Sequence, residues 1–324
     1  MKVVLQLNDT IPAKNYGGVN RVVWALGQSL AQLGHEVVFL APKSSQCSFA
    51  SMLEWRPNVA LNQQLPKVFD IVHLHSSIKF ENEIPTIHTI HGYPSEKPLP
   101  QNACFVSRAH AAQFGSEVFV HNGLDWSEVP VPNFKSERTN FHFLAKAAWQ
   151  VKNLRGALSA IKQVEGARLD VLGGHRFNFH MGFRFTLTPQ ARFWGMVDDA
   201  TKYKVLLASK GLIFPVLWHE PFGLALIESL YMGCPVFGSP YGSLPEIITD
   251  EYGYLTDSTE LLVQAMLNAH TYDAFACHEY AKHQFHSDQM AIRYLALYKK
   301  VISGESLNPE NPQLQQSPRG LPWR

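Results

Sequence analysis

Apolar runs of strand length alternate with helix-like periodic segments from the start of the chain. Residues 3–7 (VVLQL) form such a run, and a polar loop that carries Gly17 and Gly18 follows it. Between 19 and 33, apolar residues recur every three or four positions, which predicts a helix with one apolar face. Residues 36–40 (EVVFL) then resume as a strand, so the order predicts a strand–helix–strand unit with parallel strands.

Two series of this kind follow one another along the chain. In the first series, further strand candidates lie at 70–75, 86–90, 103–106 and 117–120. In the second series, strand candidates lie at 141–145, 168–172, 212–216 and 235–238. The predicted helices of the second series lie at 153–164, at 223–232, from near Ser243, and from 258 to about 302. At the third of these helices, Ser243 and Glu246 have the spacing of a capping box. Strands that alternate with helices predict parallel sheets covered by helices on both faces.

A segment rich in turn-forming residues separates the two series. Residues 122–137 (NGLDWSEVPVPNFKSE) contain two prolines, and we place a domain boundary at their end. The sequence therefore predicts an α/β protein with two Rossmann-like parallel-sheet domains, 1–137 and 138–284. We expect a helix at 285–302 that returns to the first domain. The last residues, 303–324, are rich in amides and prolines and are predicted to form a loose tail.

Composition narrows the class of protein. The chain has 324 residues, 46% of them apolar, and a formal net charge of +1, which excludes a disordered chain and argues against a nucleic-acid binder. No apolar run approaches the roughly 18 residues that a membrane-spanning helix needs, so we expect none. The four cysteines form no CxxC pair, which indicates free thiols in a reducing cytosol.

The near-zero net charge hides an uneven distribution. Residues 138–210 hold 12 basic and 4 acidic side chains, whereas 211–324 hold 6 basic and 12 acidic ones. The basic segment begins the second predicted domain, and this excess predicts a site for an anion there.

Three loops carry residues suited to binding a phosphorylated ligand. Gly17 and Gly18 precede a helix, where adjacent glycines allow a phosphate to approach backbone N–H groups; a tight turn is the alternative. Lys146 and Lys152 follow strand 141–145 and could neutralise a diphosphate; a solvated loop is the alternative. Outside these three loops, Gly173 and Gly174, at the end of strand 168–172, are further candidates for that ligand's site.

The third loop is the segment 219–236 (HEPFGLALIESLYMGCPV). Glu220 lies before the predicted helix and Glu228 lies within it, so the pair suits hydrogen bonds to sugar hydroxyls. The backbone N–H groups of Phe222, Gly223 and Leu224 stand at the helix start and could meet a phosphate. For Glu228, a surface carboxylate is an equally good interpretation of the spacing.

Two other patterns favour structural interpretations. His73 and His75 share one face of a strand, but no third and fourth ligand has metal-site spacing, so we expect no metal site. The segment 175–194 mixes arginines with alternating aromatics, which predicts strands with one buried face. Contact of its arginines with an anionic lipid-linked acceptor is the lesser alternative.

Five segments, in order over about 2–260, resemble the family 4 retaining glycosyltransferases of the GT-B fold, in which two Rossmann-like domains face each other across a cleft. They are YGGVNRVVWALGQSLAQLGHEV at 16–37, HTIHGYP at 88–94, HNGLD at 121–125, the lysine pair, and HEPFGLALIESLYMGCPVFGS at 219–239. The last matches the family's spacing of two glutamates with seven residues between them. The chain departs from the family where Ala145-Lys146 and Lys152-Asn153 replace a Gly-Arg and a Lys-Gly pair.

The resemblance implies a role for each matched residue. Gly17 and Gly18 would face the donor diphosphate, and Lys146 and Lys152 would bind it. His91 would contact the donor sugar. The carboxylate of Glu220 would hold the hydroxyls of the transferred sugar, assisted by the backbone after it, and that of Glu228 would hold the ribose hydroxyls. Asn122 and Gly123 would close the first domain's side of the cleft.

The activity implied is transfer of a sugar from a nucleoside diphosphate sugar to a hydroxyl acceptor with retention of configuration. The family needs no metal and no other cofactor. The expected partners are this donor and a glycan or lipid-linked glycan, in surface polysaccharide or lipopolysaccharide synthesis. We expect a cytoplasmic location. Peripheral contact with the inner face of the membrane is compatible with this location. An epimerase of the same fold and a non-catalytic subunit that binds nucleotide sugars are the alternatives.

Overall fold

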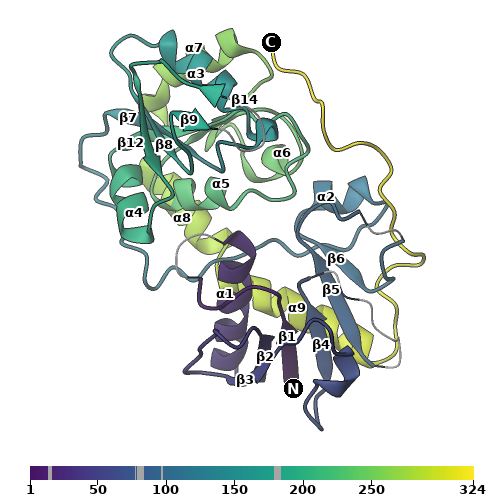
Figure 1. Cartoon of the computed structure of the whole chain (residues 1–324). Helices are drawn as coiled ribbons and strands as arrows, with labels where there is room; N and C mark the ends of the chain where they lie inside the picture. The colour runs from purple at the N-terminus through teal and green to yellow at the C-terminus, as the bar shows by residue number, and fades with distance from the viewer. Residues whose placement is uncertain (14–16, 77, 79–83, 96–97, 179–183) are drawn as a thin grey trace. The chain divides into compact units, whose positions relative to one another are not determined.

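The computed structural model describes residues 1–13, 17–76, 78, 84–95, 98–178 and 184–324 (Figure 1). The chain forms two compact units. Unit 1 comprises Met1–Trp126 and Phe285–Gln316, and unit 2 comprises Ser127–Gln284 and Ser317–Arg324. The first boundary therefore lies before the predicted position at 137.

The residues between these two positions explain the difference. The amide of Leu124 donates to the carbonyl of Phe285, 2.9 Å away, in unit 1. The ring of Phe134 lies 5.4 Å from the Phe275 ring and from the His278 ring, both in unit 2. The turn-rich segment thus divides between the units: it belongs to unit 1 up to Trp126 and packs on unit 2 from Ser127 on.

Unit 1 is built on a parallel six-stranded sheet with the strand order β3-β2-β1-β4-β5-β6. Its strands are β1 (Lys2–Gln6), β2 (Glu36–Ala41), β3 (Ser51–Glu54), β4 (Ile71–Leu74), β5 (Thr86–Ile90) and β6 (Ala103–Phe105). Its helices are α1 (Gly18–Gln32), the short η1 (Leu61–Gln63), α2 (Arg108–Gln113) and α9 (Ser287–Ile302). The strand predicted at 117–120 is reduced to a single bridge between Phe105 and Phe119.

Unit 2 contains a second parallel sheet, with the order β11-β8-β7-β12-β13-β14, and a two-stranded antiparallel pair. The sheet consists of β7 (Asn140–Leu144), β8 (Leu169–Leu172), β11 (Ala191–Gly195), β12 (Ser209–Phe214), β13 (Val236–Gly238) and β14 (Gly253–Leu255), and the pair of β9 (Phe177–Asn178) and β10 (Arg184–Phe185). The helices are η2 (Gln150–Lys152), α3 (Leu154–Lys162), α4 (Asp199–Leu207), α5 (Leu224–Tyr231), α6 (Leu244–Ile247), α7 (Thr259–Leu267), η3 (Ala269–Thr271) and α8 (Ala274–Gln284). The two parallel sheets confirm the predicted α/β fold class.

Helix α9 belongs to unit 1 although it comes late in the chain. The hydroxyl of Ser29 on α1 donates to Asp288 Oδ1 over 2.7 Å and lies 2.9 Å from the hydroxyl of Ser287. Both rings of Tyr294 and Tyr298 are fully buried. The helix is therefore part of the core of unit 1.

Residues 303–324, drawn in yellow in Figure 1, do not form the predicted loose tail. Asn308 is buried, and its side-chain amide donates to the carbonyls of Gln101, at 2.6 Å, and Ala103, at 2.9 Å. Further on, the amide of Arg324 donates to the carbonyl of Asp257 over 2.7 Å. The prediction was wrong because amides and prolines that lack a periodic pattern can still satisfy the polar groups of a folded surface.

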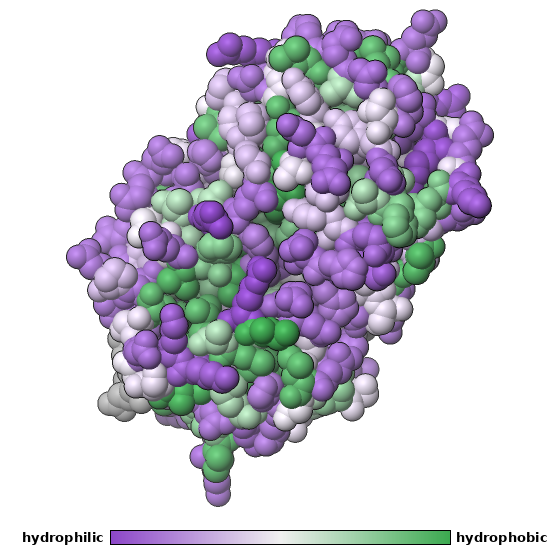
Figure 2. All heavy atoms as spheres, turned by 180° about the vertical axis from the view of Figure 1, so that it is seen from behind, coloured by the Kyte–Doolittle hydropathy of each residue, from purple (hydrophilic) through white to green (hydrophobic). Residues whose placement is uncertain are grey.

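The outer surface is mixed in character. Figure 2 shows polar side chains over most of one face, with smaller groups of apolar side chains among them. Among the described residues, no helix is both long enough and apolar enough to cross a membrane.

Candidate functional site

Lys152 and Glu220 form a buried ion pair in unit 2. Lys152 follows β7 and Glu220 follows β12, and these two neighbouring parallel strands end at the same edge of the sheet. The Lys152 ammonium donates to Glu220 Oε2 over 2.5 Å, and Trp218 Nε1 donates to the same oxygen over 2.7 Å. Only 9% of Lys152 and 5% of Glu220 is exposed. The pair therefore lies where the low dielectric strengthens its attraction.

Aromatic rings surround the Lys152 ammonium. It lies 5.1 Å from the centre of the Phe214 ring and 5.0 Å from that of Trp218. The Trp149 ring packs edge-on against Trp218 at 6.2 Å. These rings stabilise the cation through their faces and exclude water from the ion pair.

Gly242 and Ser243 pack against the loop that carries Glu220. The amide of Ser243 donates to the carbonyl of Glu220 over 2.9 Å, and its hydroxyl donates to the carbonyl of Phe222 over 2.7 Å. The predicted capping box is wrong, because the Ser243 side chain makes no cap bond to α6. Gly242 has φ of 63°, and a Cβ there would lie 2.2 Å from the Glu220 nitrogen.

Gly242→Ala is expected to lower the free energy of unfolding by about 2 kcal/mol, since it adds left-handed strain and a backbone collision. Urea unfolding followed by circular dichroism measures the loss. Gly166→Ala is the matched control: Gly166 has φ of 71°, and nothing lies within 4 Å of its added Cβ. Equal losses in the two variants would show that the contact with the Glu220 loop adds nothing.

A second buried ion pair joins α4 and α5. The Lys202 ammonium bonds Glu228 Oε1 and lies 2.8 Å from Asp199 Oδ1. Glu228 is 8% exposed, so the surface interpretation of this carboxylate is wrong. The pattern around Lys202 carries no motif that could have singled it out; the basic excess over 138–210 is the sole signal that includes it.

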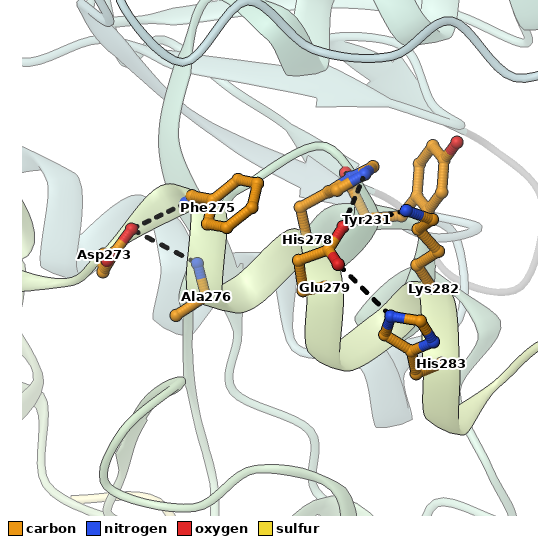
Figure 3. Close-up of polar contacts among 8 residues, drawn as sticks. All are labelled: Tyr231, Asp273, Phe275, Ala276, His278, Glu279, Lys282 and His283. Carbon is orange, nitrogen blue, oxygen red and sulfur yellow. Dashed lines mark hydrogen bonds and ion pairs between the residues drawn. The ribbon is translucent and has the colours of Figure 1, made fainter.

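Helix α8 fixes the far end of α5, which carries Glu228. His278 Nδ1 donates a hydrogen bond of 2.5 Å to the carbonyl of Tyr231 at the last turn of α5, as Figure 3 shows. On the same helix, Glu279 accepts hydrogen bonds from Lys282 at 3.0 Å and His283 at 3.2 Å (Figure 3). The bond from His278 therefore fixes the last residue of α5, whose first residue, Leu224, follows Gly223 in the left-handed region.

Lys202→Met is expected to lower the free energy of unfolding by about 2 kcal/mol, because it leaves Glu228 as a buried charge with its ammonium partner removed. The double variant Lys202→Met/Glu228→Gln should recover most of that loss, since no net charge is then buried. Chemical unfolding of the three proteins measures the cycle. Lys204→Met, at an exposed position on the same helix, should change stability by less than about 0.5 kcal/mol.

Gly173 and Gly174 are required by close packing at the end of β8. A Cβ on Gly173, where φ is 99°, would lie 2.3 Å from the carbonyl oxygen of Ala145. One on Gly174 would lie 2.3 Å from the Cβ of Ala147. The two glycines thus let the chain after β8 approach the loop that carries Lys146, an exposed side chain whose ammonium lies 5.8 Å from the Trp149 ring centre.

The predicted residues of unit 1 lie at the start of α1 and the end of β5. Gly18 begins α1, and a Cβ on Gly17 would touch the side chain of Asn20 at 3.2 Å. His91 directly follows β5, and its Nε2 shares a hydrogen bond of 3.0 Å with His75 Nδ1. Gly123 packs against the start of α9, where an added Cβ would lie 2.7 Å from the His286 carbonyl oxygen.

His91 belongs to a group of five histidines, which we call the histidine cluster: His73, His75, His88, His91 and His110. Burial lowers the pKa of His91 to about 3, with repulsion from His110 and His88 adding to it. Burial likewise lowers the pKa of His88 to about 4 and that of His110 to about 3. For His73 and His75, burial first and then neighbouring histidines hold the pKa well below its usual value. The cluster is therefore neutral at pH 7.

Sequence comparisons agree with this geometry. Residues 16–113 match the family described as Glycosyltransferase Family 4, and 125–271 match that described as Glycosyl transferases group 1. The structure of AviGT4, a glycosyltransferase involved in avilamycin A biosynthesis, is similar with a TM-score of 0.74, 18% identity, and coverage of 94% of this chain and 98% of that one. The chain belongs to the family 4-type glycosyltransferases of the GT-B fold.

Two further solved structures resemble this glycosyltransferase in fold, and one curated protein matches part of its sequence. Anabaena HepE, solved in complex with UDP and glucose, has a TM-score of 0.62 at 12% identity and is covered in full, with 93% of this chain. WaaG, a glycosyltransferase involved in lipopolysaccharide biosynthesis, has a TM-score of 0.61 at 14% identity over the same shares. An uncharacterized 41.2 kDa protein in the cps region of Klebsiella pneumoniae is 30% identical over 114 residues. This match spans about a third of each protein, 33% of this chain and 32% of that one.

Asn153 stands where the pattern of the family has a glycine, and its backbone takes a conformation that glycine favours. Asn153 has φ of 52°, in the left-handed region that asparagine tolerates better than most residues. Its side chain accepts a hydrogen bond of 2.9 Å from the amide of Gly156 and so caps α3. Asn153 therefore fits the left-handed turn that directly follows Lys152.

Among the described residues of this glycosyltransferase, no group of three or more histidine, cysteine or acidic side chains could hold a metal ion. The expectation that the enzyme works without a metal or other cofactor stays a prediction.

Proposed function

We propose that this glycosyltransferase moves a sugar from a nucleoside diphosphate sugar to a hydroxyl group of an acceptor and retains the anomeric configuration. The Lys152–Glu220–Trp218 cluster carries the proposal, because it joins a cation and a carboxylate at the carboxyl edge of a parallel sheet, where such folds bind ligands. The UDP and glucose bound by HepE support a nucleotide-sugar donor.

Lys152 is proposed to bind the donor diphosphate. An ammonium has three donor hydrogens, so it can keep Glu220 and still donate to a phosphate oxygen. Lys146 on the neighbouring loop and the N-terminus of α5, from Phe222 to Leu224, would add positive potential. Together they stabilise the negative charge that grows on the leaving group in the transition state.

The two buried carboxylates are proposed to bind hydroxyl groups. Glu220 would accept hydrogen bonds from the transferred sugar, and Glu228, oriented by Lys202, would accept them from the ribose. In unit 1, His91 is proposed to contact the donor sugar, and Gly17 and Gly18 to face the diphosphate. A neutral imidazole, which the lowered pKa of His91 ensures, can donate to or accept from a sugar hydroxyl.

Retention is proposed to follow from attack on the face that the diphosphate leaves. The bond between sugar C1 and the phosphate oxygen breaks, and a bond from C1 to the acceptor oxygen forms. The acceptor's proton passes to the departing phosphate oxygen, so no side chain is needed as nucleophile or base. The acceptor is proposed to be a glycan or lipid-linked glycan of surface polysaccharide or lipopolysaccharide synthesis, which the similarity to WaaG supports.

The test begins with thermal shifts in UDP, ADP, GDP and their glucose derivatives, since a ligand of the native state raises Tm. The stabilising donor is then incubated with and without a glycan acceptor, and proton NMR identifies the product anomer. A product with the donor's configuration supports the proposal. An inverted product, or conversion of the donor to an epimer in the absence of acceptor, would contradict it.

A further inference from the structure

A polar hollow lies in unit 2 at the edge of the sheet opposite to Lys152 and Glu220. It has a volume of 510 Å³, and its lining includes Asn140, Arg168, Asp170, Arg176, Gln190 and Arg192. Asn140 begins β7, and Arg168 and Gln190 directly precede β8 and β11. The hollow is therefore at the amino-terminal ends of these strands, away from the carboxyl ends that carry the proposed donor site. We call it the arginine hollow.

Positive charge exceeds negative charge in the arginine hollow. Its three guanidinium groups face one carboxylate, and neutral donors already serve that carboxylate: Asn140 Nδ2 at 2.9 Å and Trp194 Nε1 at 2.8 Å bond Asp170. Across the described ranges, neither Arg168 nor Arg192 forms an ion pair, and Arg192 stacks 3.8 Å above the Trp194 ring. Exposed guanidinium groups without a carboxylate are suited to bind a phosphate through two parallel hydrogen bonds.

Arg176, which lines the hollow, is fixed by hydrogen bonds to three backbone carbonyls. Its guanidinium donates to the carbonyls of Thr186 at 3.2 Å and Thr188 at 3.1 Å, and also to that of Ala191. These bonds tie the strand pair β9–β10 to the start of β11. The residues on either side of the tied segment are thereby fixed beside the hollow.

Exposed apolar side chains stand next to these bonds. Phe177 follows Arg176 and is 46% exposed, Phe185 is 55% exposed, and Leu187, between the two bonded threonines, is 77% exposed. The Phe177 and Phe185 rings pack edge to face at 5.6 Å, so they form one surface. The prediction that this segment buries one face is wrong for these three residues. Aromatic and leucine side chains that border a basic site match the boundary between lipid headgroups and acyl chains.

We propose that the arginine hollow binds the phosphate of an anionic lipid headgroup while Phe177, Phe185 and Leu187 enter the lipid surface. Two uncompensated guanidinium groups supply the attraction to the membrane, and the three apolar side chains supply insertion. This places unit 2 on a membrane through a surface separate from the proposed donor site. The proposal requires no step of the sugar transfer, and binding is measured without donor or acceptor.

The test is co-flotation of the full chain with vesicles of phosphatidylcholine, with and without about one-third phosphatidylglycerol, at 0.1 M salt. The protein should float with the anionic vesicles and not with the neutral ones. Arg168→Gln/Arg192→Gln should weaken binding at least about tenfold, and Leu187→Ser about fivefold. All these side chains are exposed, so the variants should keep the Tm of the unaltered chain to within about 2 °C.

Matched controls come from the same unit. Arg155→Gln removes an exposed arginine of α3, and Leu267→Ser removes an exposed leucine of α7; neither should change binding. No flotation with anionic vesicles, or equal losses in these controls, would overturn the proposal. A second outcome would also overturn it: a protein that does not float but binds inorganic pyrophosphate in calorimetry, with this binding lost in Arg168→Gln/Arg192→Gln. The hollow would then bind a soluble anion.

Discussion

Lys152→Met is expected to lower kcat/KM for sugar transfer about 1000-fold. The substitution keeps the volume of the side chain but removes the cation where the leaving diphosphate gains charge, and loss of one such group costs about 10² to 10³ in rate. The proposed role in the transition state predicts that kcat falls more than KM rises. Steady-state kinetics with the donor found by thermal shift measures the effect.

A loss of folding would also lower the rate, because the variant leaves the buried Glu220 carboxylate bonded to Trp218 but without its ammonium partner. The double variant Lys152→Met/Glu220→Gln buries no net charge there and should fold, yet remain as inactive as the single variant. Lys162→Met, at an exposed position on α3, should keep the full rate. A folded Lys152→Met protein with near-normal kcat would remove Lys152 from the proposed mechanism.

Acidification from pH 7.5 to 5.5 is expected to lower the free energy of unfolding by at least about 4 kcal/mol. Folding depresses the pKa of His88 to about 4 and those of His91 and His110 to about 3, from the usual 6.5. The unfolded chain therefore takes up protons below about pH 6.5 while the folded chain does not. Each histidine costs about 1.4 kcal/mol over this interval, and the stability is fully present above pH 6.5.

Urea unfolding at pH 7.5, 6.5 and 5.5 measures this loss, whose slope reports the number of protons taken up. His88→Gln removes one buried titrating group and should reduce the pH-dependent loss by about 1.4 kcal/mol. His270→Gln, at an exposed position, should leave the loss unchanged. A wild-type stability that stays level down to pH 5.5 would show that the cluster takes up protons in the folded state.

The sequence predicted the sheets and placed Lys152 and Glu220 in loops that follow two strands, but it did not predict that the two side chains form an ion pair. Buried parallel strands read as continuous apolar runs, and residues that follow neighbouring strands gather at one edge. The role of Lys202 was not predicted, because its contact with Glu228 depends on how α4 packs on α5. No spacing of residues along the chain indicates that packing. Strand β3 was not predicted either, because this edge strand consists of half-buried and exposed residues and has no continuous apolar run.

The alternation of apolar and polar residues also could not predict that Phe177, Phe185 and Leu187 are exposed. Alternation of apolar and polar residues shows that a strand has two unlike faces, but it does not show what covers the apolar one. In β9 and β10, the described apolar side chains remain open to solvent, and the interpretation as a buried face therefore failed.

The path of the chain has a consequence for its synthesis on the ribosome. The chain changes unit after Trp126, after Gln284 and after Gln316, so neither unit is one continuous segment. Unit 1 lacks α9, with the buried Tyr294 and Tyr298, until residue 302 has been added. Unit 1 therefore cannot be completed before the main segment of unit 2, Ser127–Gln284, has been synthesised.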